Sequence, residues 1–96
     1  MNRAEILTTA RDLTMGERNV QHGHPRVNLT NIASLWSGYF GDPTMFDAHD
    51  VAVMMVLLKM ARTKTGATNP DDYVDAAAYA AIAGEIAMML EPKQGS

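Results

Sequence analysis

The sequence predicts an all-α domain of about four helices, most simply an antiparallel bundle that is completed by oligomerisation. Three observations lead to this prediction: apolar residues recur at helical spacing, capping residues precede the helical segments, and no segment alternates regularly between apolar and polar residues. A chain of 96 residues, 47% of them apolar, fits one domain. Because folding hides only about 60% of the surface of so short a chain, we expect a homo-oligomer.

Composition excludes several classes of protein. The chain has no cysteine, which excludes disulfides and thiolate metal sites. Its net charge of -3 argues against binding to a nucleic acid polymer, which needs a surplus of Lys and Arg. The longest apolar run, residues 51–58, is far shorter than the roughly 20 residues of a membrane-spanning helix. The N-terminus also lacks the apolar core of a secretory signal, so we expect a soluble, cytoplasmic protein without a membrane partner.

The first helix is predicted from its start signal. Asn2 and Glu5 have the spacing of a capping box, and apolar residues then recur at helical spacing until Gly16. Residues 17–24 are polar and irregular, which indicates a loop.

A second helix is expected to begin at Pro25, because proline favours the first helical position. One face of this helix is apolar and contains Leu29, Ile32, Ala33, Trp36, Tyr39 and Phe40. Gly41 and Pro43 end the segment. Aromatic residues at this spacing usually belong to a core, although they could also stack on a nucleobase.

The third helix should begin after Asp47, which can cap it, with Asp50 in its first turn. Residues 51–58 have no polar face, so this helix must be covered on most sides by its own chain or by another copy. We therefore expect it at the centre of the fold. Gly66 ends it, after a final turn that contains Lys59, Arg62 and Lys64.

The fourth helix has a strong start in Asn69 and Pro70, and it should extend to about Leu90. Alanines and one glycine leave little side-chain bulk between residues 76 and 84, so a neighbouring helix can approach closely there. The predicted domain spans residues 1–91, and residues 92–96 are expected to be a disordered tail. Five methionines are expected in the core or in a subunit interface: Met54, Met55, Met60, Met88 and Met89.

Asp72, Asp75 and Tyr79 form the densest group of candidate functional residues. Their spacings of three and four place them on one surface of the fourth helix. Two carboxylates on one surface could share a Mg²⁺ ion, which prefers oxygen ligands. The simpler interpretation is that the acidic residues stabilise the positive end of the helix dipole. Asp75 fits that interpretation less well, because it interrupts an alanine-rich surface.

Lys59 and Arg62 are three residues apart at the end of the third helix. They could hold a phosphate, or pair with Asp72 and Asp75 across a helical hairpin. A plain role as solvated charges at a helix C-terminus is the alternative.

The loop before the second helix is a further candidate, because a helix N-terminus flanked by Arg18 and Arg26 is suited to an anion. His22 and His24 are separated by one glycine and could hold a transition metal, but capping and packing within the loop is the simpler interpretation.

The chain resembles a group of small, often phage-encoded helical domains. The resemblance extends from Ile6 to Glu85, and His22 stands where that group would have Tyr. The matching residues are Arg18, His22-Gly23-His24-Pro25, Asn28, Ile32-Ala33, Leu35-Trp36-Ser37, Asp50-Val51-Ala52, Met54-Met55, Lys59, Ala61-Arg62, Asp72, Val74-Asp75-Ala76 and Tyr79.

More distantly, residues 59–79 look like the later part of MazG-like all-α nucleoside triphosphate pyrophosphohydrolases. That resemblance implies a dimer or tetramer that hydrolyses (d)NTP with Mg²⁺ held by an ExxE and an ExxD box. Residues 72–75 are similar to the second box, with Asp in place of Glu. The first box is missing, and the second helix offers only Asn28 and Asn31 at that separation.

Two functional hypotheses follow. The first is a nucleotide-binding protein, and specifically a MazG-like Mg²⁺-dependent pyrophosphohydrolase. In it, Asp72 and Asp75 hold the metal, while the nucleotide is bound by Arg18, His22, Arg26, Lys59, Arg62 and Tyr79. The second is a phage accessory protein without catalysis that binds or sequesters a nucleotide or a host protein. An assembly protein without a ligand is a third alternative.

Overall fold

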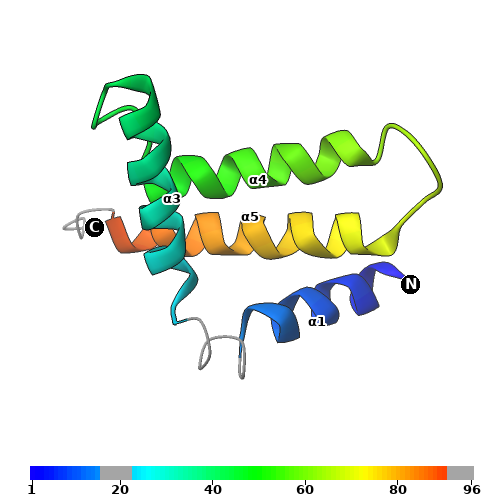
Figure 1. Cartoon of the computed structure of the whole chain (residues 1–96). Helices are drawn as coiled ribbons and strands as arrows, with labels where there is room; N and C mark the ends of the chain where they lie inside the picture. The colour runs from blue at the N-terminus through cyan, green and yellow to red at the C-terminus, as the bar shows by residue number, and fades with distance from the viewer. Residues whose placement is uncertain (16–22, 91–96) are drawn as a thin grey trace.

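The computed structural model describes residues 1–15 and 23–90 of the chain (Figure 1). Within these residues it contains four α-helices and no strand: α1 (Arg3–Thr14), α3 (Pro25–Phe40), α4 (Ala48–Arg62) and α5 (Pro70–Leu90). The prediction of an all-α fold with four helices is confirmed. The expected tail at residues 92–96 and most of the expected loop at residues 17–24 lie outside the described residues.

Two helices begin with the capping boxes that the sequence predicts. At α1, the Asn2 side chain accepts from the Glu5 N–H at 2.9 Å, and the Glu5 carboxylate accepts from the Asn2 N–H at 3.1 Å. At α4, Asp47 and Asp50 form the same reciprocal pair at 2.8 and 3.0 Å. Each box satisfies backbone N–H groups that have no partner within the helix.

Helix α5, rather than α4, is the central element of the fold. It contacts α1, α3 and α4, whereas α4 contacts α5 and α3. Helices α4 and α5 form the expected antiparallel pair, and α1 lies along the other side of α5 and runs in the same direction as α5 (Figure 1). Helix α3 crosses this layer at a steep angle, so the arrangement differs from a simple antiparallel bundle (Figure 1). Small side chains explain the central place of α5, because alanines let helices approach on more than one side.

The core consists of two clusters on different sides of α5. The larger one joins α3, α4 and α5, and its buried members are Leu29, Ala33, Ala48, Val51, Ala52, Ala83 and Ile86. In the smaller one, Ala10 of α1 packs against Val74 and Ala78 of α5. Of the alanine-rich stretch, Ala78 packs in the smaller cluster with α1 and Ala83 in the larger cluster with α3 and α4, so neighbouring helices pack on two sides of this surface.

The crossing angle of α3 leaves part of its apolar face uncovered. Leu29, Ala33 and Ser37 are buried at the crossing, but Tyr39 is 87% exposed and Phe40 is 61% exposed. The expectation that these two aromatic residues belong to the core is wrong. The C-terminal part of α3 extends past α4, so none of the other described helices covers it (Figure 1).

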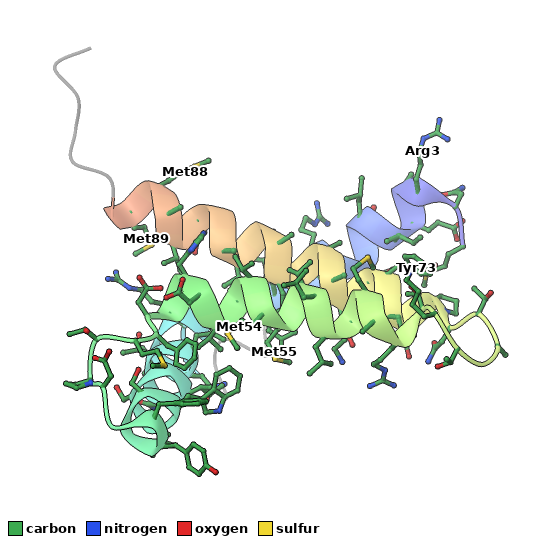
Figure 2. All side chains as sticks on the ribbon, turned by 90° about the horizontal axis from the view of Figure 1, so that it is seen from above. Arg3, Met54, Met55, Tyr73, Met88 and Met89 are labelled. Atoms are coloured by element: carbon green, nitrogen blue, oxygen red, sulfur yellow. The ribbon has the colours of Figure 1, made fainter. Side chains whose placement is uncertain are left out.

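Helix α4 is also only partly covered. Val51 and Ala52 are fully buried, whereas Leu57 is 62% exposed and Leu58 is 47% exposed. Of the five methionines, Met55 and Met60 are half-buried and the others are exposed, with Met88 pointing away from the molecule (Figure 2). None of the described helices combines the length and the apolar character needed to cross a membrane.

Candidate functional site

A cleft of about 480 Å³ is lined by residues from both core clusters. All four described helices contribute to its wall, together with Gly23 just before α3. The lining residues are Leu13, Thr14, Gly23, Pro25, Asn28, Leu29, Lys59, Asp75, Ala78, Tyr79 and Ile82. The apolar part of the wall comes from both clusters, and the polar part is concentrated in a few side chains. A cleft of this volume is large enough to hold a small molecule.

An ion pair between α4 and α5 forms the charged part of the cleft wall. Lys59 Nζ lies 3.1 Å from Asp75 Oδ2, and the two side chains are 16% and 30% exposed. Pairing stabilises both charges where little water reaches them. A lysine ammonium carries three N–H donors, so Lys59 can donate to Asp75 and still contact a ligand.

A second ion pair lies farther along the same two helices. Arg62 Nε is 3.1 Å from Asp72 Oδ1, with the Asp72 side chain 9% and the Arg62 side chain 57% exposed. Neither residue lines the cleft. The predicted pairing of two cations with two carboxylates across the hairpin is therefore found. However, the structure separates Asp72 and Arg62 from the cleft that contains Asp75 and Lys59.

Tyr79 and Asn28 complete the polar side of the cleft. Tyr79 is half-buried, packs against the larger core cluster and also lines the cleft. Asn28 is exposed on the first turns of α3 and supplies an amide with donors and an acceptor.

His24 joins the start of α3 to α5. Its Nδ1 accepts the Arg26 backbone N–H at 3.0 Å, and its Nε2 lies 2.9 Å from Glu85 Oε1. Because Nδ1 accepts, Nε2 carries the proton and donates to the carboxylate. The capping role that the sequence suggested for His24 is confirmed. Sequence reasoning missed Glu85, although it is the only charged residue between residues 76 and 90.

The other candidates in the loop before α3 have different outcomes. The Arg26 side chain is half-buried, and it does not line the cleft. Arg18 and His22 lie outside the described residues.

Asp47, His49 and Asp50 are a further group that could in principle hold a metal ion. One ligand atom from each lies within 4.8 Å of the others. However, both carboxylates accept backbone N–H groups in the capping box of α4. Helix capping therefore accounts for this group.

Together, the fold and the cleft define a small all-α domain with an ion pair in the wall of a cleft formed by several helices. The chain belongs to the family described as a domain of unknown function, DUF6378, which matches residues 5–87.

The chain is also similar to proteins of two mycobacteriophages. It is 42% identical to the Gene 55 protein of Mycobacterium phage D29 over 90 residues, which cover 94% of the chain and 57% of that protein. It is 42% identical to the Gene 55 protein of Mycobacterium phage L5 over 77 residues, which cover 80% of the chain and 49% of that protein. The chain thus spans about half the length of these curated relatives, and no solved structure matches it. The resemblance to phage-encoded helical domains is confirmed.

Proposed function

We propose that this domain binds a nucleotide in the cleft between α1, α3, α4 and α5. The observation that carries the proposal is the position of Lys59, whose ammonium lies in the cleft wall and is held there by Asp75. Lys59 is paired with Asp75, but its ammonium carries three N–H donors, so this pairing leaves donors for a phosphate oxygen. Lys59 would therefore contact a phosphate of the ligand.

The rest of the cleft suits the other parts of a nucleotide. Its volume of about 480 Å³ falls within the range of small-molecule sites. The Tyr79 ring offers a surface for stacking a base, and the Asn28 amide can hydrogen-bond to a base or a sugar. Both side chains lie in the same cleft as Lys59, which supports one ligand that contacts all three.

The carboxylate of Asp75 fits a Mg²⁺ ion that is shared with a nucleotide, but not one held by protein ligands alone. Mg²⁺ is usually bound by one or two carboxylates together with substrate phosphates. Among the described residues Asp75 is the one carboxylate that lines the cleft, since Asp72 is paired with Arg62 outside it. We therefore propose Asp75 as the metal ligand and assign Asp72 a structural role. The ion would offset negative charge on the phosphate oxygens.

Binding without catalysis is the function that this donor set supports best. A pyrophosphohydrolase of the MazG-like type holds its metal with two acidic boxes, whereas the side chain that α3 contributes to the polar wall of this cleft is the amide of Asn28. An uncharged amide does little to fix a divalent cation. Hydrolysis remains a second candidate, because Lys59, Asp75 and Tyr79, which carry the MazG-like resemblance, all line the one cleft.

Calorimetric titration with the linear and cyclic nucleotides, with and without Mg²⁺, tests the binding proposal. Lys59→Met keeps the aliphatic stem and removes the charge, and we expect it to weaken binding about tenfold or more. Lys64→Met is the matched control, because Lys64 is exposed just beyond the end of α4 and does not line the cleft. If no nucleotide binds, or if both variants behave alike, the proposal is wrong.

Hydrolysis is tested separately by measuring pyrophosphate release from each (d)NTP in the presence of Mg²⁺. Asp75→Ala should abolish any activity, whereas Asp71→Ala should retain it, because Asp71 is exposed in the first turn of α5. Nucleotide binding without release of pyrophosphate would leave the binding proposal standing and reject the hydrolase.

A further inference from the structure

The end of α3 and its connection to α4 form an exposed aromatic surface away from the cleft. We call it the aromatic corner and define it by Leu35, Trp36, Tyr39, Phe40, Met45 and Phe46. Four of the chain's six aromatic residues lie here. Leu35 is 73%, Tyr39 is 87% and Phe40 is 61% exposed, which is far more than a core face would be. Large exposed apolar groups that lie together indicate a contact surface.

Contacts within the chain fix the arrangement of the aromatic corner. Its rings pack edge to face in a continuous chain, with centroid distances of 5.5 Å from Tyr39 to Phe40, 5.9 Å from Phe40 to Phe46 and 6.0 Å from Phe46 to Trp36. The buried Ser37 hydroxyl donates to the Phe46 carbonyl and accepts from the Phe46 N–H, which fixes the connection onto α3. A surface that is already ordered loses little conformational entropy when a partner binds.

Charge in this part of the chain has a single sign. Residues 27–58 contain three aspartates, Asp42, Asp47 and Asp50, and neither Lys nor Arg. All three follow α3 or start α4, so they border the aromatic corner. This charge attracts cations, and cations also interact favourably with the faces of aromatic rings.

We propose that the aromatic corner docks a segment of another protein that presents Arg or Lys beside apolar side chains. The apolar groups would pack on the aromatic rings, and the cations would face the aspartates. The negative charge disfavours a nucleic acid or an anionic membrane surface. A second copy is disfavoured because a two-fold contact places the same patch on both sides, and three aspartates would face three others.

NMR titration of the whole, ¹⁵N-labelled domain tests this proposal. The probes are two synthetic helical peptides with the same leucine pattern, one with Arg and one with Glu at the remaining positions. We expect the Arg peptide to shift amide signals within residues 35–50, and the Glu peptide to leave them unchanged. Raising the salt concentration should weaken the binding.

Three variants locate the contact. Tyr39→Ala should weaken binding of the Arg peptide about tenfold, as expected for an aromatic anchor. Asp42→Asn keeps an oxygen acceptor for Thr44 but removes the charge, and should weaken binding about threefold at low salt. Tyr73→Ala is the control, because Tyr73 is 41% exposed at the opposite end of the molecule (Figure 2).

Several results would overturn the proposal. Equal effects of the two peptides, shifts outside the aromatic corner, or unchanged affinity in Tyr39→Ala would exclude a cationic partner at this surface. If light scattering gives a dimer that Tyr39→Ala converts to single subunits, a second copy occupies the surface instead.

Discussion

At the scale of single residues, the two ion pairs between α4 and α5 differ in which partner is enclosed. In the pair that lines the cleft, the side chains of Lys59 and Asp75 are both largely covered. In the other pair, Asp72 is enclosed and Arg62 extends toward solvent. An enclosed carboxylate depends on its partner, because an unpaired charge there lacks both water and a counterion. Arg62 therefore holds Asp72 in place, and this contact joins the beginning of α5 to the end of α4.

Replacing Asp72 should lower stability more than replacing its neighbour. Asp72→Ala should reduce the free energy of unfolding by about 1–3 kcal/mol, since Arg62 is exposed enough to be hydrated after it loses its partner. Asp71→Ala should change it by less than about 0.5 kcal/mol, because Asp71 is exposed. Chemical denaturation of both variants checks the difference. If Asp72→Ala lowers the free energy of unfolding no more than Asp71→Ala does, the ion pair between Asp72 and Arg62 does not stabilise the fold.

The carboxylate of Asp42 makes the free energy of unfolding depend on pH. The Thr44 backbone N–H and then the Thr44 hydroxyl donate to its carboxylate and lower the pKa of Asp42. A lowered pKa in the folded state means that this contribution is complete above the unfolded pKa of about 3.9 and is lost as the pH falls through the folded value. Thr44→Val removes the hydroxyl and keeps the N–H. An NMR titration should then find the Asp42 pKa higher than in the parent, though still below the unfolded value.

At the scale of helices, the beginnings could be predicted because their signals are local. The capping residues Asn2 and Asp47 and the prolines Pro25 and Pro70 precede or start helices at the predicted positions. The steep crossing of α3 could not be predicted, because it depends on how side chains from three helices fit together. The exposure of Tyr39 and Phe40 follows from that crossing, which is why a correct helix was assigned the wrong buried face.

Two glycines of α3 should respond to substitution in opposite directions. Gly41 ends the helix with φ of 74°, a conformation that alanine adopts only with strain, so Gly41→Ala should cost about 1 kcal/mol. Gly38 lies inside the helix, and an added Cβ there meets no atom within 4 Å. Gly38→Ala should therefore stabilise the domain by about 0.5–1 kcal/mol. Thermal unfolding of the two variants should shift in opposite directions, and shifts of the same sign would contradict the assigned roles.

At the scale of the molecule, the candidate site was only partly predictable. Lys59, Asp75 and Tyr79 were identified from spacing and do line one cleft. Spacing along one helix could not separate Asp75 from Asp72, because the partner of each carboxylate depends on where α4 lies. Glu85 was missed for a similar reason, since its contact with His24 joins residues that are 61 positions apart.

The uncovered face of α4 supports the prediction of a homo-oligomer. Val53, Met54, Leu57 and Leu58 are 36–62% exposed and share one side of the helix. Light scattering at micromolar concentration should therefore give a mass above that of one subunit. Leu57→Glu should lower the mass, because a buried charge disfavours the contact. Leu7→Glu, at a leucine of α1 that is 63% exposed, is the matched control. A mass of one subunit for the parent chain would contradict the prediction.

The central place of α5 affects how the chain reaches its fold during synthesis. Helices α1, α3 and α4 all contact α5, which is translated after them. The apolar surfaces that they bury against α5 therefore stay uncovered until α5 has been synthesised. The connections between α3 and α4 and between α4 and α5 are equally short, so these contacts close small loops, whereas the contact between α1 and α5 closes a much longer stretch of chain. A chain that ends before Pro70 would keep the contact between α3 and α4, but it would lack the helix on which α1 and one side of α4 pack.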